Sequence, residues 1–126
     1  MAIVFVATDN APKAIGPYSQ AILHGDMLFV SGQVAYKPFT DEIDLSSIEN
    51  ETKQVMENIK TIVEAAGMKM NNIVKSSIFL IDMNNFGKIN DVYGKYFEKD
   101  APARETVQVA RLPKDVNVEI SVVAMK

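Results

Sequence analysis

Residues 46–67, SSIENETKQVMENIKTIVEAAG, carry the strongest structural signal in the sequence. Apolar residues recur there at the three- and four-residue spacing of a helix that buries one face: Ile48, Val55, Met56, Ile59, Ile62, Val63 and Ala66. Ser46 and Glu49 have the spacing of a capping box, in which each side chain accepts a hydrogen bond from a free backbone N–H. Gly67 stands where a helix often ends in a left-handed conformation. The segment therefore predicts an amphipathic helix, whose apolar face must be covered by a flat apolar surface.

Segments typical of β-strands flank this helix on both sides. In chain order they cover residues 3–6, 18–23, 27–31, 74–81, 104–110 and 118–125. His24-Gly25-Asp26 is a tight turn between the second and third segments, and the fourth is apolar on both faces, which is typical of an interior strand. Asn84 is expected to cap a second helix that reaches Phe97. This order predicts one α+β domain over residues 1–126, with two helices on one face of a mixed sheet.

The composition suits a small globular domain and excludes several classes of function. Of 126 residues, 48% are hydrophobic and 23% charged, and the net charge of −3 provides no basic field for nucleic acid. Because there is no cysteine and only one histidine, His24, disulfides and thiolate chemistry are excluded and no metal site is expected. The chain starts without the features of a secretory signal and has no apolar run of about 20 residues, so we expect a cytoplasmic protein that does not enter membranes.

Strand parity draws attention to the second face of the sheet. The apolar residues from Val118 to Ala124 alternate onto one face of the last strand, and Glu119 lies on the other. In the preceding strand Val107 and Val109 are taken as the covered side. The face away from the helices would then carry, besides Glu119, the polar residues Arg104, Thr106 and Gln108. Such a face could be exposed to solvent, lie in a subunit interface or form a ligand site, for instance a carboxylate clamp beside a general base.

Six groups of residues resemble the signature of the Rid/YjgF family, in that family's order. They are 14–20 (AIGPYSQ), 30–33 (VSGQ), Asn58-Ile59 with 64–67 (EAAG), Phe86 with Asn90 and Tyr93, 101–104 (APAR), and 110–115 (ARLPKD) with 118–120 (VEI). A protein of this family is expected to have a chorismate-mutase-like α+β fold and to assemble as a homotrimer. Its sheets would lie inside, its helices outside and its sites between subunits, so the second face of the sheet would meet neighbouring copies.

The resemblance also implies an activity, that of a 2-iminobutanoate/2-iminopropanoate deaminase. Such an enzyme hydrolyses reactive 2-enamine and 2-imine acids, for example 2-aminoacrylate, to 2-oxo acids and ammonia, and it needs no cofactor. By resemblance, Arg104 grips the substrate carboxylate with two hydrogen bonds and Glu119 orients or activates the attacking water. Tyr18 walls the pocket and is grouped with these two as catalytic. Further substrate contacts are assigned to the backbone of Thr106 and to Ser31, Gly32 and Asn90.

Two positions depart from the family pattern. Thr106 stands where the best-studied branch often has a cysteine. Because that position is thought to act through its backbone, imine hydrolysis is expected to survive the change. Glu51 stands where many members carry glutamine, and this is expected to be a solvated surface difference.

Two other functions are compatible with the resemblance. Some family members are described as translation-inhibiting endoribonucleases, but the sequence pI of about 5.1 and the single histidine disfavour binding and cleavage of RNA. Other branches keep the trimer and cleft as small-carboxylate-binding or regulatory proteins without turnover. The presence of Glu119 favours the hydrolase over a protein that only binds small acids.

Overall fold

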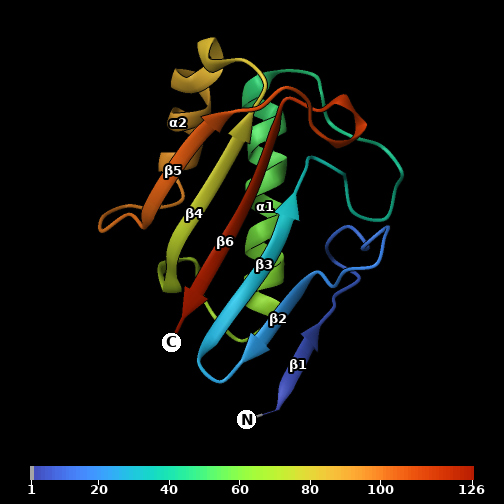
Figure 1. Ribbon diagram of the computed structural model, residues 1–126, viewed down its shortest axis with the longest axis vertical. Helices are drawn as coiled ribbons and strands as arrows, with labels where there is room; N and C mark the ends of the chain where they lie inside the picture. Colours follow the sequence, from blue (N-terminus) through green and yellow to red (C-terminus); the bar gives the residue numbers. More distant parts are fainter. Residues whose placement is uncertain (1) are drawn as a thin grey trace.

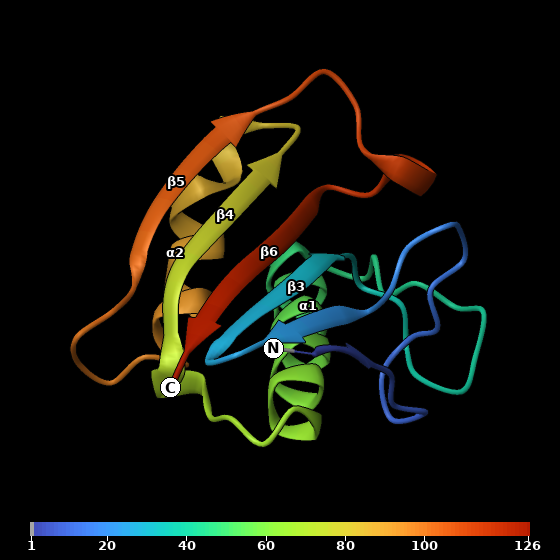
Figure 2. The same ribbon diagram turned by 60° about the horizontal axis from the view of Figure 1, so that its bottom comes forward.

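The computed structural model describes residues 2–126 and contains one six-stranded sheet with two helices. The strands are β1 (Ile3–Val6), β2 (Ala21–His24), β3 (Met27–Gln33), β4 (Ile73–Leu80), β5 (Ala103–Gln108) and β6 (Val118–Met125). Their order in the sheet is β1-β2-β3-β6-β4-β5, and only β4 and β5 run parallel. The helices α1 (Ile48–Ala65) and α2 (Phe86–Gly94) cover the same face of the sheet (Figure 1, Figure 2). The predicted α+β architecture is thus confirmed.

The core lies between α1 and the middle of the sheet. The predicted apolar stripe of α1 is buried, with Val55, Met56, Ile59, Ile62 and Val63 all at 0% exposure. The alternate residues of β6 face this stripe and are at most 3% exposed. Burying a side chain of this size contributes roughly 1.5–3 kcal/mol, so this contact sets which face of the sheet is covered. Among residues 2–126, neither helix is long and apolar enough to cross a membrane.

The ends of the helices differ in detail from the prediction. Ser47, not Ser46, caps α1, because the helix begins one residue later at Ile48 and the Ser47 side chain accepts a hydrogen bond from the Asn50 N–H. The predicted capping box of Ser46 and Glu49 is therefore wrong. Gly67 has a φ of 79°, as a left-handed helix end requires.

The second helix begins after a short 3-10 turn at Met83–Asn85. Asp82 caps that turn by accepting a hydrogen bond from the Asn84 N–H, so Asn84 is not the cap. The helix ends at Gly94 rather than at Phe97.

The strand boundaries shift by a few residues. β2 starts at Ala21, because the backbone turns at Tyr18, whose N–H donates to the Gly16 carbonyl. The hairpin to β3 turns at Gly25, which has a φ of 61°. β3 runs on to Gln33, with an irregularity in its pairing to β6 between Val30 and Gln33. The interior position predicted for 74–81 is confirmed, since β4 lies between β6 and β5.

The prediction that Arg104, Thr106 and Gln108 share a face with Glu119 is wrong. These three residues pair with Ser76, Ile78 and Leu80 of β4, which are buried beneath the helices. Glu119 instead pairs with Phe79, which belongs to the opposite face. The parity argument failed because it took the valines of β5 to mark the covered side. Val107 is 40% exposed on the open face, whereas Arg104 lies against aromatic rings of α2.

The face of the sheet away from the helices keeps many apolar side chains exposed. Phe5 is 69% exposed, Phe29 45% and Met125 41%, and all three belong to the register positions that face away from α1. Nothing in residues 2–126 packs over this face, which looks toward the viewer in Figure 1. Apolar surface of this extent is typical of an interaction surface.

Candidate active site in two halves

Arg104 stands on β5 beneath two aromatic rings of α2. Its guanidinium carbon lies 5.1 Å from the centre of the Tyr93 ring and 5.6 Å from that of Phe86. Both rings attract the cation through their π faces. No ion pair among the described residues includes Arg104. Its planar fork of N–H donors is therefore oriented by stacking and left available for a carboxylate.

The stacking partner Tyr93 is itself held in place from below. Its hydroxyl donates a 2.9 Å hydrogen bond to the Ser76 hydroxyl of β4, and both residues are buried. Burial raises the pKa of Tyr93, so its ring stays neutral beside the guanidinium. Asn90 lies four residues after Phe86 and three before Tyr93, which places it on the same side of α2. Arg104, Asn90 and Thr106 make up what we call the Arg104 half-site.

Thr106 contributes an unusual hydroxyl to this half-site. Its Oγ1 is buried and has no hydrogen-bond partner within residues 2–126. Thr106 lies on β5, whose outer edge has no neighbouring strand in the described chain. An unsatisfied buried hydroxyl costs about 1–3 kcal/mol, and such a group is often retained at a binding site or an interface.

The remaining predicted site residues lie together at the other half. A pocket of about 410 Å³ is lined by Tyr18, Ser31, Gly32 and Glu119, together with Lys114 and other residues of the same loops. This volume suits a small ligand, and we call the space the Glu119 pocket. The Ser31 hydroxyl donates a 2.6 Å hydrogen bond to the Ser19 carbonyl, so it fixes the segment that carries Tyr18.

Glu119 is the one acid that lines this pocket among residues 2–126. Its carboxylate has no hydrogen-bond or ion-pair partner among the described residues, and burial raises its pKa above the ordinary value of 4.5. A half-buried carboxylate with raised basicity and no partner can accept a proton from water. The role that the resemblance assigns to Glu119, orienting or activating the attacking water, stays a prediction.

The two halves are too far apart for one chain to form a complete site. β6 and β5 lie about 10 Å apart, with β4 between them. Val107 is the β5 residue level with Glu119, and Arg104 precedes it by three residues, or about 10 Å along the strand. The two side chains also project from opposite faces. A three- or four-carbon acid is roughly 5 Å long, so it cannot touch Arg104 and Glu119 of the same chain.

Comparisons with known proteins identify the family. Residues 8–126 match the family model described as Endoribonuclease L-PSP, which is the Rid/YjgF family. The chain belongs to this family. A RutC family protein of Pyrococcus horikoshii is 52% identical over 121 residues, which cover 96% of each chain. The 2-iminobutanoate/2-iminopropanoate deaminase of Escherichia coli is 45% identical over 124 residues, again covering 96% of each chain. The solved structure of E. coli TdcF with bound serine has a TM-score of 0.94 and 42% identity, and covers 98% of each chain.

Two polar residues of the family signature, Gln20 and Asn58, support the Glu119 pocket, although the sequence assigned neither of them a function. The buried Gln20 amide donates to the carbonyls of Thr8 and Pro12 and accepts from the Thr8 N–H, so it holds one wall. Asn58 of α1 donates to the carbonyls of Val34 and Tyr36 and holds another. Asn58 lies on the apolar stripe of α1, and a polar residue on such a stripe is a signal that could have found it.

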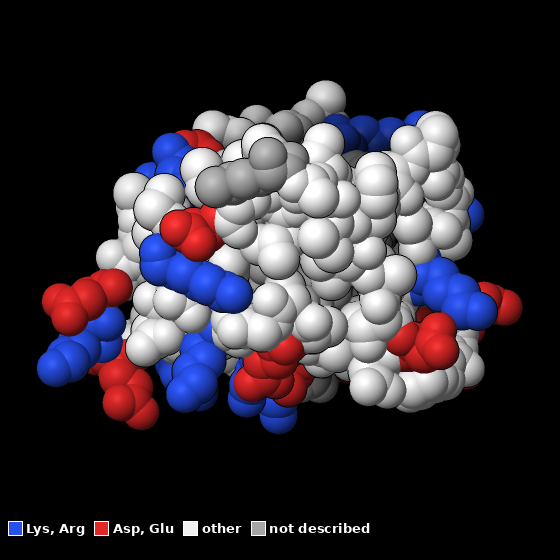
Figure 3. Space-filling model, turned by 90° about the horizontal axis from the view of Figure 1, so that it is seen from below, with Lys and Arg blue, Asp and Glu red and all other residues white. Residues whose placement is uncertain are grey.

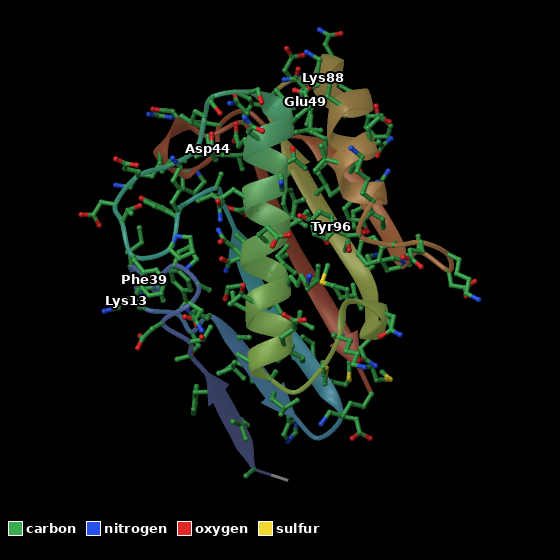
Figure 4. The ribbon with its side chains drawn as sticks, turned by 180° about the vertical axis from the view of Figure 1, so that it is seen from behind. Lys13, Phe39, Asp44, Glu49, Lys88 and Tyr96 are labelled. Atoms are coloured by element: carbon green, nitrogen blue, oxygen red, sulfur yellow. The ribbon has the colours of Figure 1, made fainter. Side chains whose placement is uncertain are left out.

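Lys13 and Phe39 mark the outer rim of these loops. They lie close together at the side of the molecule (Figure 4).

Gly32→Ala tests how closely this Rid family pocket is built around Glu119. An added Cβ would lie 2.7 Å from the Glu119 carboxylate oxygen and 2.8 Å from its carbon. Because the Glu119 side chain can rotate away, we expect the variant to fold and to have nearly the wild-type melting temperature. The Glu119 carboxylate should, however, no longer lie in the pocket. A crystal structure with Glu119 in its present position beside the alanine would contradict this prediction.

Proposed function

We propose that this protein hydrolyses small 2-imino acids, and their 2-enamine tautomers, to 2-oxo acids and ammonia. The observation that carries the proposal is the Glu119 carboxylate in a small pocket, in a chain that also presents Arg104 stacked on aromatic rings; neither group has an ion-pair partner among residues 2–126. The E. coli relative named as an imine deaminase supports the reaction, and the relative solved with serine supports a small carboxylate-bearing ligand.

The reaction makes modest demands on the protein. Arg104 would hold the substrate carboxylate through two N–H groups. The Thr106 backbone, Asn90 and Ser31 would make further contacts with the substrate. A water oxygen adds to the imine carbon while the Glu119 carboxylate takes a proton from that water. That proton passes to the substrate nitrogen, which gives a carbinolamine carrying a hydroxyl and an amino group on the same carbon. Glu119 then takes the hydroxyl proton and delivers it to the amino group, so the C–N bond breaks, ammonia leaves and the C=O of the 2-oxo acid forms. Most of the acceleration would come from position and orientation.

The site we propose is completed by a second copy of the chain, in a homotrimer. One chain separates Arg104 from Glu119 by more than a small acid can span, and the open face of the sheet exposes Phe5, Phe29 and Met125. Packing that face against neighbouring copies would bury these side chains. It would also let the Arg104 half-site of one copy approach the Glu119 pocket of the next.

Cleavage of RNA has less support in this chain. Figure 3 shows lysine and arginine side chains interspersed with acidic ones on that side of the molecule, with no continuous basic surface. With a net charge of −3, the electrostatic attraction that dominates binding to a phosphate backbone is weak.

A coupled assay tests the deaminase with and without Glu119. A dehydratase forms 2-aminoacrylate from serine, and the decay of the imine is followed over a range of pH, with the uncatalysed rate subtracted. The base form of Glu119 is the carboxylate, so the wild-type rate should rise with pH and have its midpoint above 4.5 because burial raises the pKa of Glu119. Glu119→Gln should lower kcat by about 10²-fold and remove that pH dependence.

The same variant separates catalysis from binding. Glu119→Gln leaves Arg104 intact, so it should bind 2-oxobutanoate, the product of the four-carbon imine, as tightly as the wild type does. If the wild-type protein accelerated neither 2-aminoacrylate decay nor that of a bulkier imine, the deaminase would be rejected. Binding of small carboxylates without turnover would then become the leading function.

A further inference from the structure

Glu51 is a buried acid that the proposed reaction does not use. It lies in the first turn of α1 and is 0% exposed, so the expectation of a solvated surface residue is wrong. No lysine or arginine forms an ion pair with it among residues 2–126. A buried carboxylate is costly unless hydrogen bonds replace the lost water, so its surroundings require an explanation.

Three N–H donors converge on the Glu51 carboxylate. One oxygen accepts from the backbone N–H of Asn117 at 2.8 Å and from that of Val118 at 3.2 Å. The other accepts from the Asn117 side-chain amide at 2.7 Å. All three donors belong to the two residues that directly precede Glu119 on the chain. Glu51 thus fixes the backbone at the point where β6 begins.

The same hydrogen bonds end a tightly turned loop. Lys114 and Asp115 both have positive φ, 59° and 54°, a conformation that is uncommon outside glycine, asparagine and aspartate and is therefore least expected at Lys114. Lys114 lines the Glu119 pocket. The Asn117 carbonyl accepts a 3.2 Å hydrogen bond from the Ile81 N–H, so this residue is held by both α1 and the end of β4.

We propose that Glu51 is a positioning residue, which holds the Glu119 carboxylate and the Lys114 wall of the pocket in their working positions from the helix side of the sheet. The proposal rests on the proposed function, since it takes Glu119 as the group that activates water. Glu51 itself touches no substrate.

The arrangement tolerates one carboxylate across positions 51 and 117 but not two, and glutamine at position 51 suits either partner. In Glu51→Gln the amide oxygen can accept from the two backbone N–H groups, and the amide nitrogen can donate to the Asn117 side chain once that side chain turns over. In Asn117→Asp two carboxylates face each other at about 3 Å, where at least one is disfavoured. In the double variant Glu51→Gln/Asn117→Asp the introduced amide donates to the introduced carboxylate. This variant has the wild-type net charge and the same number of hydrogen bonds.

These three variants test the proposal, because the double variant should restore what Asn117→Asp alone disrupts. At neutral pH we expect Asn117→Asp to lower kcat by at least about tenfold with little change in KM, because Glu119 moves while Arg104 still holds the substrate. Glu51→Gln and the double variant should stay within about threefold of wild type. Asn71→Asp, which adds the same charge at an exposed position, is the matched control and should leave the rate unchanged.

A second readout does not depend on turnover. The Glu119 carboxyl can be titrated by NMR in protein labelled with ¹³C-glutamate, and assigned with Glu119→Gln. In Asn117→Asp its pKa should fall toward the ordinary value, since displacement exposes the group, and in the double variant it should return. If Asn117→Asp does not fold, Asn117→Ala removes one donor without adding charge and should give the same changes in smaller measure.

The outcomes separate this inference from the proposed function. A wild-type protein that hydrolyses no imine would reject the proposed function, whereas the Glu119 titration would still test the positioning. Lower stability in Asn117→Asp or Asn117→Ala with unchanged kcat and unchanged Glu119 pKa would overturn the inference, and so would a double variant no better than Asn117→Asp.

Discussion

Arg104→Ala is expected to lower kcat/KM for a 2-imino acid by about 10²–10³-fold. The carboxylate is the main charged group by which the protein can bind such a small substrate. Arg104 would bind it through two charge-assisted hydrogen bonds of about 1.5–3 kcal/mol each. A loss of about 3–4 kcal/mol corresponds to that change in rate. The loss should also appear in binding, so calorimetry with 2-oxobutanoate should show an affinity weakened by a similar factor.

Two further variants separate the guanidinium from its charge. Arg104→Lys keeps the cation but loses the planar fork, and it should recover only part of the affinity. Lys88→Ala removes one positive charge from an exposed position on the same helix, α2. Lys88 makes none of the described contacts of Arg104, so this variant should behave as wild type. Arg104→Ala protein that bound 2-oxobutanoate with wild-type affinity would show that the carboxylate is held elsewhere.

The sequence predicts the parts of the fold in which periodicity and burial agree. The stripe of α1 from Val55 to Val63 and the alternation of β6 both describe surfaces that are covered inside one chain. Many residues repeat the same spacing in each segment, so the spacing predicts reliably whether the segment is a helix or a strand. The start of α1 is decided by one hydrogen bond, and two adjacent serines, Ser46 and Ser47, compete for it. A pattern cannot separate positions that differ by one residue.

The orientation of β5 could not be predicted from its own residues. Arg104 is placed by contacts with Phe86 and Tyr93, which belong to another element. Val107 remains open on the other face, and its covering, if the trimer forms, lies outside the chain. The rule that valines mark the covered face holds only when all of the burial is internal. β5 is an edge strand, and its Val107 is not covered within the described chain.

Glu51 shows the same limit in a helix. It lies four residues before Val55, on the buried stripe of α1, although a charged residue in a first turn is expected from the sequence to reach solvent. Its hydrogen-bond donors are 66 and 67 residues away along the chain. Among the site residues, Tyr18, Ser31, Gly32 and Glu119 come together as the resemblance implies. Arg104, Thr106 and Asn90 form the separate half, so which chain supplies each half is a question about assembly.

Mixed oligomers of two inactive variants should recover activity. In Arg104→Ala subunits the Glu119 pocket is intact, and in Glu119→Gln subunits the Arg104 half-site is intact. If a site takes one half from each of two neighbouring copies, random mixing in a trimer gives both intact halves at about a quarter of the sites. Co-expression with two different affinity tags, followed by tandem purification, would isolate the mixed species, and their kcat should greatly exceed that of either parent.

The contrary result is equally specific. If Arg104 and Glu119 of one chain served the same site, every subunit of the mixture would lack one of the two groups. Mixed oligomers would then show no more activity than the parents, even though both tags were present. Because the two side chains project from opposite faces and are separated along and across the sheet by about 10 Å each, we expect recovery. A wild-type protein that sediments as a monomer at assay concentration would argue against shared sites before any mixing is done.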